Sequence, residues 1–123
     1  MEAVTLFKAI SGDVDQAGGI VVRLIDDNNY YIARANALEG NVRFLRVVDG
    51  DREQLESADV EVTAGEWHTL GLRAEGDQFA VSYDGAELLK AADATFPGPG
   101  KVGLWTKADS VTHFDQLDIN VLK

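Results

Sequence analysis

The sequence predicts an all-β protein built as an antiparallel β-sandwich. Apolar and polar residues alternate through most of the chain, and no window repeats apolar residues at the spacing of a helix. The segments between the alternating stretches are rich in glycine, aspartate and asparagine, which favour turns. A chain of 123 residues can bury a two-layer core. We therefore expect one domain covering residues 1–123.

Ten strands are expected, each bounded by turn residues. The predicted strands are 3–10, 19–26, 29–36, 41–48, 52–57, 66–75, 78–84, 86–91, 101–107 and 111–121. The connectors at 26–29, 39–41, 49–51, 75–77 and 84–85 have the composition of hairpin turns. Residues 96–100 include two prolines, which cannot donate to a strand ladder, so we expect a rigid loop there.

Alternation assigns the two faces of each strand. In 19–26, Ile20, Val22 and Leu24 should face one way, and Val21, Arg23 and Ile25 the other. In 101–107, Gly103, Trp105 and Lys107 should lie opposite Val102 and Leu104. In the last strand Phe114 is out of phase with Leu117, Ile119 and Val121. A β-bulge near residues 115–116 would bring all four to the core.

Charge and composition narrow the possible partners. The chain has 21 acidic and 11 basic residues, a formal net charge of −10, which repels nucleic acid and anionic membranes. It has no cysteine, which excludes disulfides and thiolate metal sites. No apolar run is long enough to cross a bilayer, so no membrane insertion is expected. Residues 1–12 show no signal-peptide pattern, and we expect a periplasmic or extracellular location.

The polar faces of three segments carry aromatic, guanidinium, amide and carboxylate groups together. Aromatic planes pack on the C–H face of a sugar, and the polar groups bond its hydroxyls. In an alternative interpretation the arginines only pair with nearby carboxylates and the tryptophan covers a sheet edge. The candidate saccharide-binding residues are Arg23, Tyr30, Arg34, Asn36, Trp105, Lys107 and Asp109.

Two stretches carry a resemblance to a known superfamily. They are GGIVVRLIDDNNYYIARANALEGNVRFLRVVDG at 18–50 and GKVGLWTKADSVTHFDQLDI at 100–119. Together they resemble concanavalin A-like jelly-roll sandwiches, in the bacterial branch of family 16 glycoside hydrolase-like and 3-keto-disaccharide hydrolase-like domains. The resemblance runs from about Val4 to Ile119. It implies a jelly-roll fold and saccharide binding on one sheet face, but it says little about function, because lectins, glycosidases and adhesion modules share this scaffold.

The catalytic motif of family 16 glucanases is absent. Those enzymes carry Glu-x-Asp-x-x-Glu on one strand. Here Glu75-Gly76-Asp77 begins the pattern but reads as a turn, and Glu56, Asp59 and Glu61 have the wrong spacing. The two histidines, His68 and His113, lack metal-ligand spacing, and no serine sits in a nucleophile elbow.

The resemblance also implies two features beyond the binding face. Family members often hold a structural calcium near a carboxylate of the final strand, and Asp115 stands at the similar position. Asp13 and Asp15, or residues 26–29, are equally rich in oxygen ligands, and in an alternative interpretation these are ordinary acidic turns. Such domains also normally begin with further strands, which makes this sandwich look shortened. A shortened sandwich exposes an edge or an apolar face, so we expect a homodimer or larger homo-oligomer.

The sequence therefore favours a non-catalytic, carbohydrate-associated binding module with a saccharide ligand. One alternative is a hydrolase or lyase acting on a modified disaccharide. It would need two converging carboxylates, or a carboxylate and His68, in one cleft. A second alternative is a structural, self-assembling sandwich whose candidate surface is filled by its own side chains.

Overall fold

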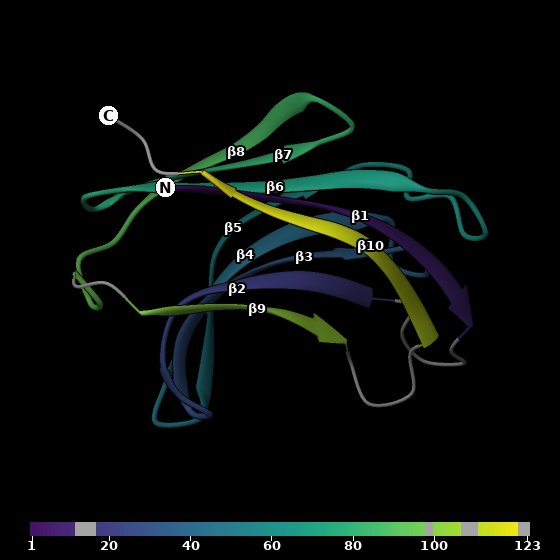
Figure 1. Ribbon diagram of the computed structural model, residues 1–123. Coiled ribbons are helices and arrows are strands. Elements are labelled where there is room, and N and C mark those ends of the chain that lie inside the picture. Colours follow the sequence, from purple (N-terminus) through teal and green to yellow (C-terminus); the bar gives the residue numbers. More distant parts are fainter. Residues whose placement is uncertain (12–16, 98–99, 107–110, 121–123) are drawn as a thin grey trace.

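The computed structural model describes residues 1–11, 17–97, 100–106 and 111–120, and it shows two five-stranded sheets packed face to face (Figure 1). All ten expected strands form, and most ends lie within two residues of the predicted ones. Every pairing between neighbouring strands is antiparallel. The all-β sandwich predicted from alternation is confirmed.

The first sheet has the strand order β10-β1-β6-β7-β8, and the second has the order β5-β4-β3-β2-β9. The strands of the first sheet are β1 (Glu2–Ser11), β6 (His68–Glu75), β7 (Gln78–Tyr83), β8 (Ala86–Ala92) and β10 (Val111–Asn120). The strands of the second are β2 (Ala17–Asp26), β3 (Asn29–Asn36), β4 (Asn41–Val48), β5 (Asp51–Asp59) and β9 (Lys101–Thr106). Consecutive hairpins join β2 to β5 in the second sheet and β6 to β8 in the first. The chain changes sheet between β1 and β2, β5 and β6, β8 and β9, and β9 and β10, as in a jelly roll (Figure 1).

Aromatic rings fill the core between the sheets. The Tyr31 ring lies 4.6 Å from that of Phe79, 5.3 Å from that of Phe96 and 5.7 Å from that of Phe44, measured between centroids. Leu70 and Leu72 of β6 and Ile20 and Val22 of β2 are buried in the same cluster. The main core therefore joins both layers.

The β-bulge expected in the last strand is present. The register between β1 and β10 shifts at Thr5/Leu6, and Gln116 has a positive φ of 57°. The Thr5 hydroxyl donates to the Gln116 carbonyl at 2.5 Å. Phe114 and Leu117 both pack against the core, because the extra residue restores their common phase. The expectation that Ile119 would join them is wrong, because Ile119 is 50% exposed on the edge strand β10, and Val121 lies outside the described residues.

A second bulge, in β2, overturns part of the predicted face assignment. Arg23 has a positive φ of 52°, and the pairing of β2 with both neighbours is irregular beyond Val22. Leu24 consequently packs on the side of Val21 and not with Ile20 and Val22. The expected faces of Arg23 and Leu24 are wrong, because a bulge reverses the alternation that follows it.

The turns use residues suited to their backbone. Gly76, between β6 and β7, has φ 60°, which confirms that Glu75-Gly76-Asp77 is a turn.

The large apolar side chains that are exposed belong to separate elements of the fold. They are Ile25, Leu38, Trp67, Leu104 and Ile119. No helix among the described residues is long and apolar enough to cross a membrane. The expected homo-oligomer stays a prediction.

Candidate binding surface

The outer face of the second sheet, the side turned away from the main core, carries its own apolar cluster. Ile20, Tyr31 and Phe44 belong to the main core, whereas Val21, Ile32 and Leu45, one position along each strand, form a second buried cluster. The solvent face of an antiparallel sheet is normally polar. Leu24, Tyr30 and Trp105 pack against this cluster. The outer face therefore has an apolar and aromatic floor.

One cross-strand row runs over this face from edge to edge. Trp105 of β9 pairs with Gly19 of β2, Gly19 with Arg34 of β3, Arg34 with Arg43 of β4, and Arg43 with Ser57 of β5. Neighbouring strands lie about 4.8 Å apart. The row thus brings an indole and two guanidinium groups to one surface, with a glycine between the indole and the first guanidinium.

Gly19 keeps the space between Trp105 and Arg34 free of a side chain. A Cβ atom at this position would lie 2.6 Å from the Ala33 carbonyl oxygen and 3.3 Å from the Cβ of Arg34. The closest of these contacts is to backbone and cannot be relieved by rotating a side chain. Gly103, on the same face of the neighbouring strand, has no atom within 4 Å of a built Cβ. Of these two glycines on the outer face, only Gly19 therefore leaves no room for a side chain.

A shallow hollow lies in this surface. Its volume is about 10 Å³, enough for at most one water molecule. A ligand would therefore lie on the surface and not inside it. The described residues that line the hollow are Tyr30, Ile32, Arg34, Leu45, Val47, Arg52 and Trp105.

The two arginines of the row differ in exposure. Arg34 is 6% exposed and lines the hollow. Arg43 approaches the Glu39 carboxylate, with Nη2 3.4 Å from Oε2. The Nε of Arg43 is covered, and no hydrogen-bond acceptor for it occurs in the described part of the chain. The Arg43 guanidinium therefore retains unused donor capacity.

The structure brings three of the predicted site residues together: Tyr30, Arg34 and Trp105 all line the hollow. Arg23 does not join them. Its Nη1 donates to the Phe96 carbonyl at 2.9 Å, and its guanidinium lies 5.0 Å from the centroid of the Phe79 ring. The bulge at Arg23 turns it toward the main core.

Asn36 has a different function from the one expected. It is fully buried, and its side-chain oxygen accepts hydrogen bonds from the backbone amides of Leu38 and Glu39 at 2.9 and 3.1 Å. Asn36 therefore stabilises the turn between β3 and β4. The remaining two predicted residues, Lys107 and Asp109, lie outside the described residues.

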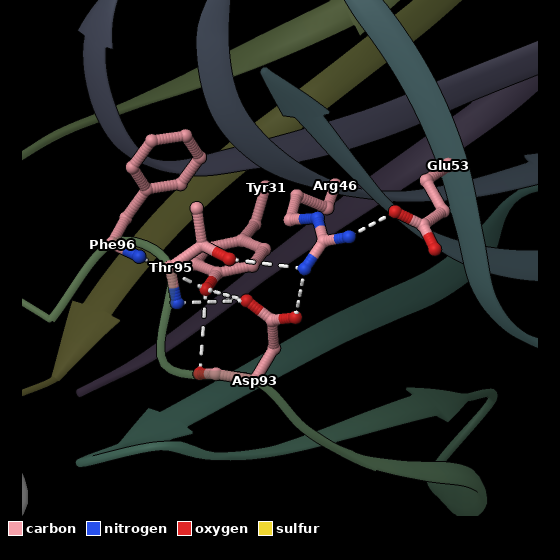
Figure 2. Close-up of polar contacts among 6 residues, drawn as sticks. All are labelled: Tyr31, Arg46, Glu53, Asp93, Thr95 and Phe96. Atoms are coloured by element: carbon pink, nitrogen blue, oxygen red, sulfur yellow. Dashed lines mark hydrogen bonds and ion pairs between the residues drawn. The ribbon is translucent and has the colours of Figure 1, made fainter.

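A separate polar network, called the end network below, joins the segment that follows β8 to β3, β4 and β5 of the second sheet (Figure 2). The side chains in it converge on Asp93, which follows β8. The Tyr31 hydroxyl donates to Asp93 Oδ1 at 2.6 Å, and Arg46 Nη1 contacts Asp93 Oδ2 at 2.6 Å. Arg46 also bonds the Thr95 hydroxyl at 3.0 Å and pairs with Glu53. An opening of about 670 Å³ lies beside the network.

Hydrogen bonds set the charge state of this network. Burial alone would raise the pKa of Asp93. Bonds from Tyr31 and Thr95 and the charge of Arg46 outweigh burial and lower the pKa of Asp93 below its ordinary value. Burial, together with the Asp93 carboxylate, raises the pKa of Tyr31. The network therefore holds an ionised carboxylate whose oxygens are already bonded, which is typical of a structural role.

His68 meets a carboxylate but does not form a catalytic pair. Its Nδ1 lies 2.9 Å from Asp84 Oδ2, and its Nε2 lies 3.0 Å from the Thr63 carbonyl oxygen. The ring is 8% exposed and packs against Phe7 and Tyr83. Both ring nitrogens are occupied within the protein, so neither is available to a substrate in this arrangement.

The calcium site that the resemblance implies stays a prediction. Asp115 is exposed on β10. Among the described parts of the chain, no group of three or more histidine, cysteine, aspartate or glutamate side chains could hold a metal ion. Asp26 instead accepts bonds from Asn28 and Asn29 in its own turn, at 2.8 and 2.9 Å.

Sequence reasoning missed two arginines of the outer face, Arg43 and Arg52. The register of the hairpin between β3 and β4 would have indicated Arg43. Asn36 and Asn41 flank a four-residue turn and pair with each other, which sets Arg34 opposite Arg43. The Tyr31–Asp93 contact joins residues 62 positions apart. No local pattern in the sequence could have indicated it.

Comparisons with known proteins agree on the fold. No protein-family model matches the chain, and a search of curated proteins finds no match. Among solved structures, the chain is similar to the carbohydrate binding module CBM66 from Bacillus subtilis, at TM-score 0.85 and 24% identity, covering 94% of this chain and 71% of that one. It is also similar to the Caenorhabditis elegans galectin LEC-6, at TM-score 0.70 and 13% identity, covering 96% and 81%.

A Bacillus licheniformis beta-glucanase is more distant. Its TM-score is 0.63 at 16% identity, and the chain covers 53% of its length. These similarities show that the chain has the jelly-roll fold of the concanavalin A-like sandwiches, as the sequence resemblance implied. The narrower likeness to 3-keto-disaccharide hydrolase-like domains stays a prediction.

Proposed function

We propose that this protein is a carbohydrate-binding module and that it holds a saccharide on the outer face of its second sheet. One observation carries the proposal: an apolar and aromatic floor containing Tyr30 and Trp105 lies on the solvent side of a sheet, directly beside Arg34. A sugar ring needs an aromatic plane for its C–H face and charged or amide donors for its hydroxyls.

The shape of the surface favours binding over catalysis. The hollow is too shallow to enclose a substrate, and its described lining contains no carboxylate that could act as acid, base or nucleophile. The similarity to a carbohydrate binding module and to galectins supports the same function. A ligand would lie across the strands, over Gly19 and between Trp105 and Arg34.

A glycan array followed by titration calorimetry tests the proposal. We expect Trp105→Ala to weaken binding of the best ligand about tenfold or more, by analogy with stacking of about 1–3 kcal/mol on aromatic platforms. Trp67→Ala is the matched control, because Trp67 is 47% exposed and lies beside Lys8, away from the outer face. Equal losses in both variants, or no glycan binding by the wild-type protein, would contradict the proposal.

A further inference from the structure

A second row on the outer face repeats the arrangement of the row that contains Trp105. In the first row Trp105 stands two strands from Arg34, with a glycine between them. In the second row Tyr30 of β3 pairs with Val47 of β4, and Val47 pairs with Arg52 of β5. Each row therefore brings an aromatic residue and an arginine to one surface, in the same order across the sheet.

The two rows are far enough apart to contact different units of a glycan chain. Tyr30 and Arg34 are four positions apart on β3, which is about 14 Å along the strand. A single sugar ring is smaller than this distance. Ile32 and Leu45 of the apolar floor lie between the rows, and both Tyr30 and Trp105 pack against them. The floor therefore connects the two rows.

The guanidinium group of Arg52 has no partner in the described part of the chain. Each of the other five arginines has an interaction within the protein. Asp49 and Asp51 share the end opening with Arg52, and neither forms an ion pair with it. Arg52 is also exposed, whereas Arg34 is buried. The donors of Arg52 are therefore available to a group that lies on the outer face.

Arg52 lines the hollow of the outer face together with Tyr30. The described lining of the hollow includes no carboxylate, so no acidic group there competes with a ligand for the guanidinium. Guanidinium donors bond neutral hydroxyls as well as anions. The second row thus offers an aromatic ring to a sugar face and unused donors to its hydroxyls.

We infer that Tyr30 and Arg52 form a second sugar subsite, so that the ligand of the outer face is an oligosaccharide and not a single sugar. The inference rests on the proposed function, and it adds a chain length and a specificity-determining residue. One unit packs near Trp105, and another lies over Val47, where Arg52 donates to its hydroxyls. The alternative is that Arg52 only protects the edge strand β5 from pairing with another sheet.

Glycans of graded length test the inference. An array carrying cello-, laminari-, xylo- and galacto-oligosaccharides of one to six units would identify the series that binds, and calorimetry would then measure the affinity of each member. We expect the affinity to rise about tenfold or more between the single unit and the longer chains, the order of one hydrogen bond to a charged group.

An Arg52 variant locates the second contact. In Arg52→Gln the ratio of long-chain to single-unit affinity should fall about tenfold, because the charged donor is lost. The thermal midpoint should stay nearly unchanged, because Arg52 has no described partner to lose. Arg73→Gln makes the same charge change on β6 of the first sheet, where Arg73 is exposed and 3.6 Å from Glu75, and should leave the ratio as in the wild type.

The outcomes separate the inference from the proposed function. Equal affinity for one unit and for six, lost in Trp105→Ala, would overturn the second subsite and leave carbohydrate binding in place. A length dependence that persists in Arg52→Gln, or that falls equally in Arg73→Gln, would also overturn the second subsite. No binding to any glycan of the array would contradict both.

Discussion

Tyr30 and Tyr31 are neighbours in the sequence but lie in regions of opposite character. Tyr31 points into the core, where its hydroxyl bonds Asp93 and the Phe96 amide. Tyr30 points to the outer face and packs against the apolar cluster there. The same residue type therefore serves stability on one side of β3 and is available to a ligand on the other.

The core side and the outer face of the second sheet differ in how many of their polar atoms have hydrogen-bond partners. In the end network both Asp93 oxygens accept bonds, and Arg46 contacts Asp93, Thr95 and Glu53 (Figure 2). On the outer face Arg43 has one long contact, to Glu39, and an unused Nε. Satisfied networks fix a structure, whereas unused donors beside aromatic surface indicate binding. Substitutions in the two regions should therefore affect different quantities.

Asp93→Ala should have the largest effect on stability. It removes the shared acceptor of Tyr31 and Arg46 and leaves Arg46 without its most buried partner. We expect a loss of about 3 kcal/mol in the free energy of unfolding, measured by urea denaturation. Glycan affinity of the folded fraction should not change. An unchanged unfolding free energy would show that the network is incidental.

The contribution of Asp93 should depend on pH. Its pKa is lowered in the folded state, so its stabilisation is complete above the ordinary value of about 4 and is lost as the pH falls through the lower folded pKa. The stability difference between the wild type and Asp93→Asn should be largest near neutrality and shrink below about pH 4. A difference that stays constant down to pH 2 would contradict the ionised assignment.

Gly19→Ala should destabilise the protein less than Asp93→Ala and also impair binding. The new methyl group meets the Ala33 carbonyl and must displace β2 or β3. We expect a loss of about 1–3 kcal/mol in unfolding free energy, typical of overpacking. Gly103→Ala is the control, because its Cβ has open space. Equal stability of the two variants would mean that the strands at Gly19 adjust freely.

Tyr31→Phe should give the smallest change in stability of the core variants. It deletes one hydroxyl, leaves Asp93 with its other donors and removes the acceptor of the Phe96 amide, so we expect a loss of about 1 kcal/mol. Tyr30→Phe should leave the unfolding free energy within about 0.5 kcal/mol of the wild type. Comparable losses in both variants, measured by thermal and urea denaturation, would remove the contrast between the two faces.

The positions of the strands could be predicted from the sequence, because alternation and turn residues are local signals. It also located the bulge at Gln116, since Phe114 and Leu117 could share a core only if one residue was added between them. The bulge at Arg23 left no such signal. The alternating pattern through Leu24 and Ile25 reads equally well without it. The expected face of Arg23 was therefore wrong.

Strand alternation, a local signal, also predicted part of the candidate surface. Tyr30, Arg34 and Asn36 share a parity, but parity does not show that Asn36 ends the strand and bonds the following turn. Trp105 was placed correctly outside the core. The end network needed knowledge of which distant segments meet, because Asp93 and Arg46 are 47 positions apart.

Amide chemical-shift mapping with the tightest-binding glycan of the array tests the central claim most directly. We expect the largest shifts on Gly19, Arg34, Arg43 and the Trp105 indole N–H, which one row of pairs connects across the second sheet. Largest shifts on the first sheet around Arg73 and Ser82, or around Asp49 and Asp51 at the end opening, would contradict it.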